Sequence, residues 1–469
     1  MAFSDPVATA SSGNSLVDGL LWGQNWSDGS PATTSLAVYI AGTAGKEKFD
    51  FGGTEVTADT FAEEVTAFNL AMQLFEQVCN VDFTIVASQA DADIIVGAVN
   101  NRDADGSLGV ATPPGEDKGP LADQQGSVIV NFKQYSSDDF SSLLQGGYDF
   151  ISFIHEFGHA IGLKHPHDRG GGVFPKFPGV SGAFDDYGDF KLNQGVFTMM
   201  SYNDGNPAGS AGIQDPNSMP GFGWEATPMA LDIAALQHLY GANMSYRTGD
   251  DTYTLPGLNT AGTFYSAIWD AGGNDRIEAG SSGDCVINLN AATLKLKAGG
   301  GGFISAHDGV FGGFTIANGV VIENASGGGG DDVLVGNKVA NVLEGGAGAD
   351  RLKGGMGADE LHGGAGADTF IYNALKDSTG TSVDTIFGFV QGRDEIDLSR
   401  IDGDGSAGAL DSFDFIGGHR FGGSAGELRF KVLADGNTKI LGDVDGDKEA
   451  DFGIVLDGVF TLQLGDFVL

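Results

Sequence analysis

A nonapeptide repeat at residues 327–371 restricts the fold of this chain more than any other feature of its sequence. The copies read GGGGDDVLV, GNKVANVLE, GGAGADRLK, GGMGADELH and GGAGADTFI. They follow G-G-x-G-x-D-x-U-x, where U is apolar, although the second copy keeps only its first Gly and has Asn341 in place of Asp. A disordered glycine-rich linker would not keep an apolar residue at a strict period of nine. One copy cannot bury its own core, so the copies must stack, which predicts a parallel β-roll. The inward apolar residues are expected to be Leu334, Leu343, Leu352, Leu361 and Phe370.

The glycines and aspartates of the repeat predict calcium sites. Glycine allows turns with positive φ that expose main-chain carbonyls, and together with Asp carboxylates these make sites of oxygen atoms only. Two nonapeptides make one coil, so alternate copies line opposite edges. Asp332, Asp350 and Asp368 should then form one ladder, and Asp359 the other with Asn341, whose neutral side chain weakens its site. The predicted calcium ligands in the repeat are Gly328, Gly330, Asp332, Gly346, Gly348, Asp350, Gly355, Gly357, Asp359, Gly364, Gly366 and Asp368.

The composition of the chain agrees with cation binding. Lys and Arg number 24 against 63 Asp and Glu, which gives a net charge of −39. This balance argues against nucleic acid or an anionic membrane as a partner. The 77 glycines exceed what a single ordinary globular domain uses. For Cys79 and Cys285 we prefer two buried free thiols, with a disulfide between them as the alternative.

Residues before about 245 show helical and strand patterns instead. An apolar stripe predicts a helix that starts with a capping box made by Thr60 and Glu63. Its buried face is expected to carry Phe61, Val65, Phe68, Met72, Phe75 and Cys79. Further helices are predicted over 143–164 and 228–239, and strands over 92–99 and 127–132.

The change of pattern at residues 245–250 predicts a domain boundary. We expect an α+β fold with an N-terminal domain over 19–245 and an all-β C-terminal domain over 246–469, the parallel β-roll. Residues 1–18 are interpreted as an N-terminal segment that serves as a propeptide. The first basic residue is Lys46, so the charged start of a secretory signal peptide is absent, and no stretch is apolar enough to span a bilayer. Taken alone, this predicts a cytoplasmic protein.

The stretch FIHEFGHAIGLKHPHD, residues 153–168, holds four of the eight histidines. On a helix, His155 and His159 leave the same face one turn apart and can bind one metal ion. Glu156 projects about 100° away, which suits a general base toward water activated by the metal better than a third ligand.

Gly162 and His165 complete the longer pattern H-E-x-x-H-x-x-G-x-x-H. Gly162 can end the helix in a left-handed conformation, and Pro166 favours an extended backbone at His165, so His165 can approach the metal. Three imidazoles leave the fourth position of zinc open, which is typical of a catalytic site. A histidine-rich surface helix is the weaker alternative, because the added Gly and His make a chance match rare. His167 is expected to be a solvated surface residue.

Downstream, TMMSYN at 198–203 resembles the methionine turn of the metzincin metalloproteases. Together with the nonapeptides, it makes the chain similar to the serralysin family of secreted bacterial metalloproteases; DIAALQHLYGAN, RTGD, WDAGGND and IENASGGGGDDVLVGN extend the likeness over residues 18–469. The resemblance implies a metzincin-type zinc protease domain ahead of the β-roll. It implies that Met200 is a hydrophobic floor under the zinc, and that Tyr202 ligates zinc in the resting enzyme and stabilises the oxyanion during turnover. From the residues alone, Met200 would be core and Tyr202 a half-buried aromatic.

The resemblance also implies calcium ligands outside the repeat. The position of Asp251 is usually Thr in the family, which leaves that ligand open. The stretch DVDGDKEAD at 443–451 alternates carboxylates as a calcium loop does, with a solvated acidic turn as the alternative. The implied ligands are Arg247, Gly249, Asp251, Asp270, Gly272, Asp275, Gly319, Val321 and Glu323.

A secreted zinc endopeptidase with one catalytic zinc and several structural calcium ions is the function that the resemblance implies. Its partners would be protein or peptide substrates, a type I secretion exporter that reads the C-terminal LGDFVL, and a small periplasmic protease inhibitor, and it would act as a monomer. That exporter would replace the cytoplasmic expectation with an extracellular one. One alternative is a non-enzymatic calcium-dependent surface or adhesin protein on a retired protease fold, which the intact histidines and Glu156 disfavour. The other is a different zinc hydrolase, which the methionine turn disfavours. The segment DRGGGVFPKFPG departs from the family's more polar loop, so cleavage preference is not carried over.

Overall fold

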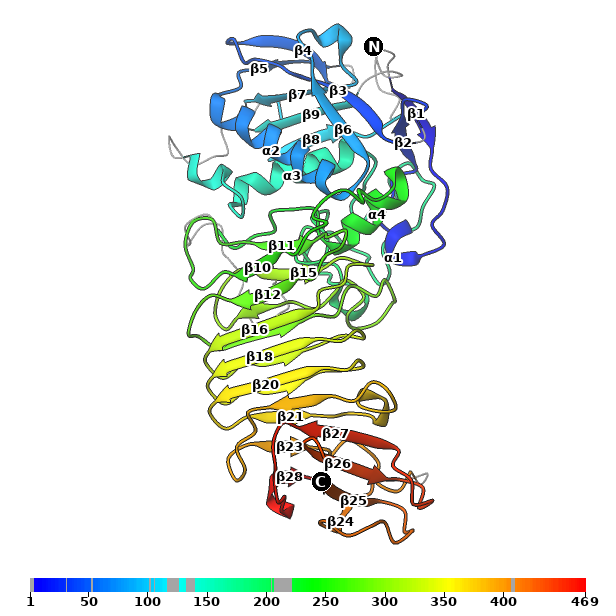
Figure 1. Ribbon diagram of the computed structural model, residues 1–469. Coiled ribbons are helices and arrows are strands. Elements are labelled where there is room, and N and C mark those ends of the chain that lie inside the picture. Colours follow the sequence, from blue (N-terminus) through cyan, green and yellow to red (C-terminus); the bar gives the residue numbers. More distant parts are fainter. Residues whose placement is uncertain are drawn as a thin grey trace.

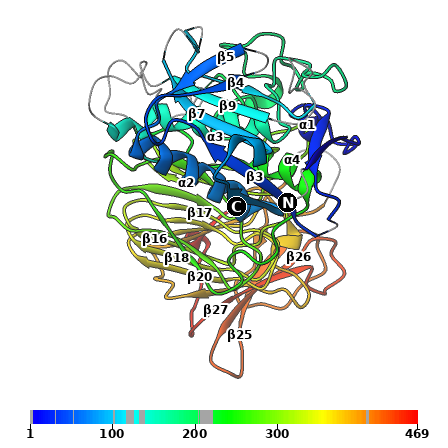
Figure 2. The ribbon, with the colours of Figure 1, turned by 90° about the horizontal axis from the view of Figure 1, so that it is seen from above.

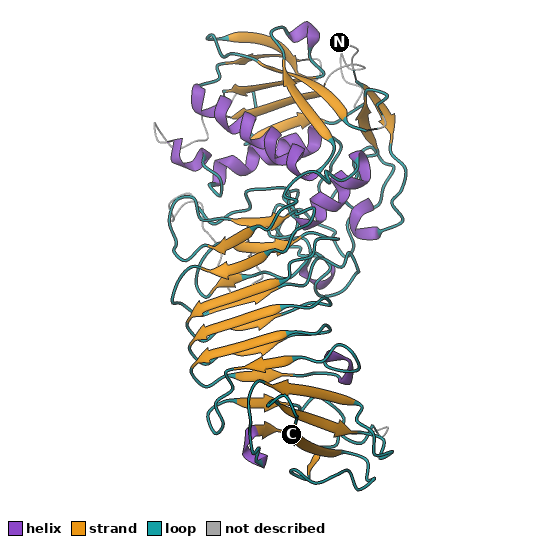
Figure 3. Cartoon of the chain, viewed as in Figure 1, coloured by secondary structure: helices purple, strands orange, loops and turns teal. Residues whose placement is uncertain are grey.

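The computed structural model describes residues 4–30, 32–51, 54–100, 103–104, 106–115, 126–131, 140–203, 205, 222–405 and 410–469. The molecule is elongated, with a sheet and helices at the N-terminal end and a stack of short strands running on to the C-terminus (Figure 1). Viewed along its length, the N-terminal part overlaps one side of this stack, and β16, β18 and β20 remain visible beside it (Figure 2). The longer helices all lie in the N-terminal part (Figure 3). The α-helices are α1 Ser15–Asp18, α2 Ala62–Val78, α3 Tyr148–Ala160 and α4 Ala230–Tyr240, and 3₁₀ turns cover Gln89–Asp91, Phe140–Leu143, Asp189–Lys191, Leu375–Asp377 and Leu464–Asp466.

A seven-stranded sheet forms the frame of the N-terminal part. Its central strand β7 pairs in parallel with β3 and β9, and β8 pairs antiparallel with β9, next to α3. The predicted strands at 92–99 and 127–132 correspond to β7 and β9, and residue 132 lies outside the described residues. The strands are β3 Thr34–Ile40, β4 Glu47–Phe51, β5 Thr54–Ala58, β6 Val81–Ile85, β7 Ile94–Val99, β8 Gly109–Thr112 and β9 Gly126–Asn131, and a separate antiparallel pair consists of β1 Asp5–Ala8 and β2 Gln24–Ser27.

Helix α2 starts differently from the prediction. The capping box of Thr60 and Glu63 is wrong: Phe61 is the N-cap, and Oε2 of Glu64 accepts its N–H at 2.8 Å. The Thr60 hydroxyl instead donates to the carbonyl of Ala41 at 2.6 Å. The contact with the neighbouring sheet therefore shifts the helix start by one residue, and the Phe61 ring is 46% exposed rather than in the buried face. Of the remaining residues predicted for the buried face, Phe68, Met72, Phe75 and Cys79 are buried, and Val65 is half-buried.

Helix α3 is shorter at both ends than the predicted 143–164. Gly147 is its N-cap, and the chain leaves the helix before Gly162, which has a φ of +107°. A Cβ at Gly162 would lie 2.6 Å from the carbonyl oxygen of Gln24, so glycine is needed both for the conformation and for the close approach of the chain. The predicted turn at Gly162 is confirmed.

Two sheets build the C-terminal part. The larger runs in the order β10 Thr252–Leu255, β12 Arg276–Ala279, β16 Asn324–Gly329, β18 Val342–Ala347, β20 Glu360–Ala365, β22 Thr385–Phe387, β27 Phe452–Leu456, β26 Thr438–Asp443, β25 Glu427–Val432 and β24 Asp414–Phe415. The smaller runs in the order β14 Ala306–His307, β13 Cys285–Asn288, β17 Val333–Val335, β19 Arg351–Lys353, β21 Thr369–Ile371, β23 Glu395–Asp397 and β28 Phe467–Val468. A further parallel pair joins β11 Tyr265–Ile268 to β15 Gly313–Ile316. Strand β26 pairs antiparallel with β25 and β27, so the larger sheet is not parallel throughout, whereas the last strand, β28, pairs in parallel with β23.

Alternate copies of the nonapeptide enter alternate sheets, as predicted. Leu334 pairs with Leu352, and Leu352 with Phe370, in the smaller sheet. Leu343 pairs with Leu361 in the larger sheet. All five side chains are fully buried, so each coil of 18 residues adds two apolar side chains to one continuous core.

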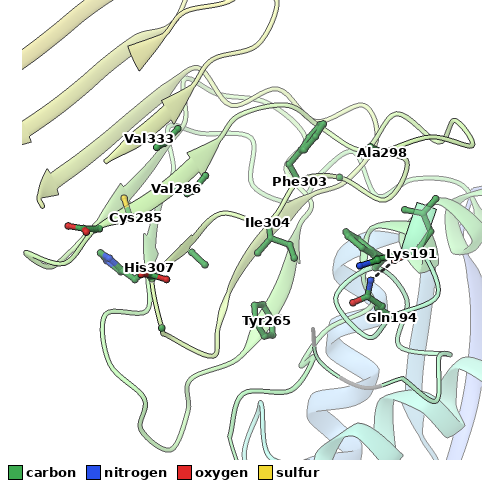
Figure 4. A pocket seen from close by; sticks show the side chains of 18 of the residues that line it. Lys191, Gln194, Tyr265, Cys285, Val286, Ala298, Phe303, Ile304, His307 and Val333 are labelled. Atoms are coloured by element: carbon green, nitrogen blue, oxygen red, sulfur yellow. Dashed lines mark hydrogen bonds between the residues drawn. The ribbon is translucent and has the colours of Figure 1, made fainter. Parts of the chain in front are cut away.

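The two parts of the molecule are joined by shared packing. One cluster of buried apolar side chains runs through both. A cavity of about 590 Å³ lies where they meet, lined by Lys191 and Gln194 from one part and by Cys285 and His307 from the other (Figure 4). Cys79 and Cys285 are free and buried, which confirms the preferred interpretation. Among the described residues, no helix is both long and apolar enough to cross a membrane.

Candidate active site

Three imidazoles from α3 and the turn after it converge on one point. His155 and His159 lie on the helix, and the turn at Gly162 brings His165 back toward them. Nε2 of His165 lies 3.1 Å from Nε2 of His155 and 3.0 Å from Nε2 of His159. Tetrahedral nitrogen ligands about 2.0–2.1 Å from zinc are themselves roughly 3.3 Å apart. The triangle of nitrogens therefore has the size that a zinc ion requires.

An oxygen acceptor orients each ring from its other side. Nδ1 donates in each case: from His155 to the Met199 carbonyl at 2.8 Å, from His159 to the Leu163 carbonyl at 3.0 Å, and from His165 to Oδ2 of Asp168 at 2.8 Å. With protons on Nδ1, all three Nε2 atoms direct lone pairs to the same point and cannot hydrogen-bond to one another. A metal ion is the partner that fits this set of donors, and the Nδ1 contacts orient the rings for it.

Burial keeps these imidazoles neutral. It lowers the pKa of His155 and of His159 to about 3, and that of His165 to about 4. Burial by itself would raise the pKa of Asp168. The hydrogen bonds from His165 and from the Gly170 N–H outweigh it and hold the pKa of Asp168 at about 2. Sequence reasoning missed Asp168, although a carboxylate three residues after a ligand is a visible signal for a side chain that orients that ligand.

Glu156 belongs to α3, and its side chain points toward the edge strand β8. Its side chain is buried, and burial raises its pKa to about 8. A Cβ on Gly109 of β8 would lie 2.7 Å from Cγ of Glu156, so a glycine lets the strand pass close to the carboxyl group. A carboxylate that lies next to the metal-binding histidine His155 and lines the cleft is placed to accept a proton from water and return it.

A cleft of about 400 Å³ opens beside His155 and Glu156. This volume lies in the range of ligand pockets in proteins. Much of its wall is apolar or aromatic, with Leu108, Ile151 and Phe184 among the lining residues.

The methionine turn lies directly beneath α3. Met200 is fully buried, and a Cβ on Gly158 would lie 2.8 Å from its sulfur. Asp232 of α4 holds the turn: Oδ1 accepts the Thr198 hydroxyl at 2.6 Å, and Oδ2 accepts the Met199 N–H at 2.7 Å. Burial raises the pKa of Asp232 to about 7. Sequence reasoning missed this aspartate, because nothing local links it to a turn 33 residues earlier.

Tyr202 stands at the edge of the histidine cluster. Its ring centroid lies 4.6 Å from that of His165 and 5.8 Å from that of His155, and its side chain is 37% exposed. His167 is half-buried and stacks on His165 with the ring centroids 4.8 Å apart. The Tyr202 ring therefore packs against the rings of two of the three histidines.

The first carboxylate ladder runs along one edge of the strand stack. Oδ1 of Asp350 accepts the Asp332 N–H at 2.9 Å, and Oδ1 of Asp368 accepts the Asp350 N–H at 3.1 Å. Asp394, which sequence reasoning missed, continues the series: its Oδ1 accepts the Asp368 N–H at 3.3 Å.

The second ladder runs along the other edge. Oδ1 of Asp359 accepts the Asn341 N–H at 2.9 Å, and Oδ1 of Asp384 accepts the Asp359 N–H at 3.0 Å. Asp384 was also missed. The signal was present, because Asp384 and Asp394 each stand two residues before an isoleucine, as the repeat aspartates stand before their apolar residue.

One oxygen of most ladder carboxylates is buried without a hydrogen-bond partner. Among the described residues, this holds for Oδ2 of Asp332, Asp350, Asp359, Asp368 and Asp384. Burial raises the pKa of Asp350 and of Asp359 to about 6. Gly346 has a φ of +111°, and a Cβ at this position would collide with the carbonyl oxygen of Gly328 in the preceding coil. The main-chain carbonyl of one coil therefore lies directly against the glycine turn of the next coil. Unpartnered carboxylate oxygens beside carbonyls form the donor set of a calcium ion.

A separate carboxylate cluster lies near the domain junction. Oxygens of Asp251, Asp270 and Asp275 come within 4.8 Å of one another, and Oδ2 of Asp275 is buried without a partner. Oε2 of Glu323 accepts the Asp275 N–H at 2.8 Å, and Nη1 of Arg247 lies 3.4 Å from Oδ1 of Asp251. The structure thus brings these predicted ligands together. The other ligands that the resemblance implies, Gly249, Gly272, Gly319 and Val321, could contribute only main-chain carbonyls.

The loop at 443–451 also gathers carboxylates. Oxygens of Asp443, Asp445 and Asp451 lie within 4.8 Å of one another. Both oxygens of Asp443 accept N–H groups of its own loop, from Gly446 at 2.7 Å and from Lys448 at 2.9 Å. These contacts are what the acidic-turn alternative requires.

Comparisons with known proteins agree with this geometry. The chain matches the family described as Peptidase M10 serralysin C terminal over residues 231–469, and the one described as Metallo-peptidase family M12B Reprolysin-like over residues 57–166. A solved structure, the AlgE6R3 subunit of an Azotobacter vinelandii mannuronan C5-epimerase, covers 31% of this chain and 72% of that chain at 30% identity, with a TM-score of 0.20 that supports no structural argument.

Curated relatives match most of the chain. It is 37% identical to Metalloprotease AprA of Pseudomonas entomophila, over 82% of this chain and 75% of the relative. It is 36% identical to Serralysin C of Dickeya chrysanthemi (87% and 80%) and 35% identical to Serralysin of Photorhabdus luminescens (85% and 75%). The non-enzymatic alternative is therefore not favoured. With a metallopeptidase match around the histidine motif and a serralysin match over the strand stack, this chain belongs to the serralysin family of zinc metalloendopeptidases.

Proposed function

We propose that His155, His159 and His165 hold the catalytic zinc ion of this endopeptidase and that Glu156 is its general base. The observation that carries the proposal is the convergence of three Nε2 atoms whose rings all have Nδ1 bound to an oxygen acceptor. No hydrogen-bond arrangement within that set satisfies the three lone pairs, whereas one cation does.

The roles of the chain's own groups follow from their positions. A zinc ion supplies Lewis-acid polarisation of the scissile carbonyl and acidifies water. Glu156, buried beside the cleft, takes a proton from the attacking water and returns it to the leaving amine. Tyr202 is proposed as a resting-state ligand whose hydroxyl later donates to the developing oxyanion. Met200 is proposed as the apolar floor beneath the zinc, which excludes water from that side of the histidine helix.

The test combines metal analysis with digestion of casein. The native enzyme should bind one zinc per chain and lose activity in a zinc chelator. Glu156→Ala should retain zinc and lose several orders of magnitude in turnover, because only the base is removed. His159→Gln should lose both zinc and activity. A Glu156→Ala variant with near-normal turnover would overturn the assignment of the base.

We propose that residues 19–245 form the protease domain and residues 246–469 a calcium-binding domain whose repeat is a parallel β-roll. The parallel register of the repeat strands and the unpartnered Oδ2 atoms support this. The calcium ligands are those predicted from the sequence, with Asp384 and Asp394 added at the end of the ladders. Limited proteolysis with and without calcium tests both the boundary and the metal.

Residues 1–18 are proposed as a separate N-terminal segment. Residues 5–8 pair with β2, and Leu16 is fully buried, so removal of the whole segment would uncover part of the core. N-terminal sequencing of the active enzyme decides whether any of it acts as a propeptide.

We propose that the enzyme is extracellular, a monomer, and exported by a type I exporter that reads LGDFVL. Phe467 of this stretch is buried where β28 pairs with β23, so the folded chain would hide part of the signal. Export before calcium-driven folding would leave it readable. A small periplasmic protease inhibitor is proposed as a further partner, and protein substrates follow from the family. Deleting the last six residues should retain the protein inside the cell.

A further inference from the structure

The glycine- and phenylalanine-rich segment between His165 and Met200 brings an aromatic side chain to the cleft. Phe184 is one of the lining residues, and its ring centroid lies 5.3 Å from that of Tyr202 at an interplanar angle of 31°. Its side chain is 69% exposed. Since it adds little to the core, it is free to bury apolar surface against a ligand that enters the cleft.

Asn203 fixes the position of this segment. Its Oδ1 accepts the Asp185 N–H at 2.8 Å, and its Nδ2 donates to the carbonyls of Asp186 at 3.2 Å and of Asn193 at 3.0 Å. Asp185 has a φ of +57°, which is uncommon outside glycine, so these contacts stabilise a backbone that would not hold itself. Phe184 directly precedes Asp185, and Tyr202 directly precedes Asn203. The side-chain amide of Asn203 therefore fixes the distance between Phe184 and Tyr202 at the edge of the metal centre.

The cleft wall favours uncharged side chains. Apart from His155 and Glu156, which are engaged in the metal site, the described lining residues carry no charge, and Leu108, Tyr148 and Ile151 offer apolar surface. A lysine or aspartate side chain would lose hydration there without gaining an ionic partner, whereas an apolar side chain gains by burial. The net charge of −39 would by itself suggest a preference for basic substrates, and the cleft argues against it.

We propose that Phe184 is a specificity-determining residue that contacts a large apolar or aromatic side chain beside the scissile bond, and that Asn203 is its positioning residue. The substrate class is peptides and unfolded protein segments with such a side chain at the cleavage point. Offset ring contact with Phe184 adds to burial for an aromatic side chain. This inference rests on the proposed endopeptidase function of the same site.

Quenched fluorescent peptides that differ only beside the scissile bond, with Phe, Leu, Ala or Lys there, test the proposal. The native enzyme should cleave the Phe and Leu peptides best and the Lys peptide worst. Phe184→Ala should lower kcat/KM for the Phe peptide about 10-fold, mainly through KM, and leave the Ala peptide nearly unchanged. An unchanged ratio between the Phe and Ala peptides would overturn the proposal.

Phe190→Ala is the matched control, because Phe190 lies on the same segment, is 57% exposed and does not line the cleft. It should keep the native ratio; a loss equal to that of Phe184→Ala would mean that the segment, and not Phe184, sets selectivity. Asn203→Ala should lower the same ratio, and the double variant with Phe184→Ala should lower it no further, since both act on one contact. Additive losses would overturn the positioning role.

Binding measured without turnover separates this inference from the proposed function. In a Glu156→Ala background, the Phe peptide should bind about 10-fold more weakly when Phe184→Ala is added. If the native enzyme cleaves none of the peptides, the proposed function fails. If it cleaves them all with the same ratio before and after Phe184→Ala, only the further inference fails.

Discussion

His165 differs from the other two histidines in what holds its Nδ1. His155 and His159 donate to main-chain carbonyls, which no substitution removes, whereas His165 donates to the carboxylate of Asp168. A hydrogen bond to a carboxylate is stronger than one to a carbonyl and makes the imidazole a better electron donor. His165 also lies on a loop, so its orientation depends most on this contact.

Asp168→Ala should therefore weaken zinc binding about 10- to 100-fold while the three ligands remain. Competition with a chromogenic zinc chelator measures the affinity. Asp168→Asn, which keeps an oxygen acceptor, should show a smaller loss. Equal affinity in Asp168→Ala and the native enzyme would remove Asp168 from the metal centre.

Tyr202 can act through its hydroxyl or only through its ring. If the hydroxyl donates to the oxyanion, Tyr202→Phe should lower kcat roughly 10²-fold with KM little changed. Steady-state kinetics on a peptide substrate separate the two constants. An unchanged kcat would leave Tyr202 as an aromatic that packs on the rings of His165 and Phe184.

At the scale of elements, the start of α2 contains a buried carboxyl group. Glu64 is fully buried, and burial raises its pKa from 4.5 to about 7. Because the folded state holds the proton of Glu64 more tightly than the unfolded chain does, this group stabilises the fold most at a pH below 4.5, the pKa in the unfolded chain. That stabilisation is lost as the pH rises through about 7, the pKa in the folded state. The cost at alkaline pH is the burial of the ionised carboxylate, since the hydrogen bond from the Phe61 N–H favours the charged form.

Glu64→Gln should remove part of this pH dependence. The difference in melting temperature between the variant and the native protein should favour the variant more at pH 8 than at pH 5. Thermal unfolding followed by circular dichroism at both pH values measures it. Glu63→Gln, at an exposed position of the same turn, should change the pH dependence much less, because the charge of Glu63 is only the smallest of the influences that raise the pKa of Glu64.

The two ladders differ in how far they need a cation. Oδ2 of Asp350 is buried without a partner, whereas Oδ1 of Asn341 accepts the Asn337 N–H at 2.8 Å and its Nδ2 donates to the Glu323 carbonyl at 2.9 Å. The Asn341 position is satisfied by the protein itself. Calcium should therefore matter more at the Asp350 position than at the Asn341 position.

Asp350→Ala should raise the calcium concentration at the folding midpoint more than Asn341→Ala does. Calcium titration of the full chain, followed by far-UV circular dichroism, gives the two midpoints. A larger shift in Asn341→Ala would contradict the difference between the edges.

For the whole molecule, the strand stack carries much glycine and few large apolar side chains per coil. Ordering glycine costs more backbone entropy than ordering any other residue, and each coil of the repeat buries only two apolar side chains. Buried carboxylates without partners add a further cost. We propose that calcium, which would bind the folded state and not the unfolded chain, supplies the missing free energy.

The full chain in excess calcium chelator should accordingly lose β signal in far-UV circular dichroism and regain it when calcium is added. Zinc should be kept at a fixed free concentration, so that only the calcium-dependent part responds. Equal spectra and equal melting temperatures with and without calcium would contradict the calcium-driven account.

Much of the site was readable from the sequence because its geometry is local. An i, i+4 pair on a helix, a glycine turn and a third histidine lie within 11 residues, and a helix fixes the relation of its own side chains. The nine-residue period is equally local, so it predicted the alternation of Leu343 and Leu352 between sheets. Asp384 and Asp394 follow the same spacing to an apolar residue and were missed because only one glycine of the pattern remains before each, Gly380 and Gly392.

Tertiary structure decided what depends on contacts between distant segments. Asp232 holds a turn 33 residues away, Gly109 is small because Glu156 passes beside it, and Asn203 holds Asp185 across 18 residues. The α2 cap is made by Glu64 and not by Glu63, because the Thr60 hydroxyl already donates to the Ala41 carbonyl and Phe61 becomes the N-cap. A local pattern offers each of these residues several partners of similar energy, and only packing of the whole chain selects one of them.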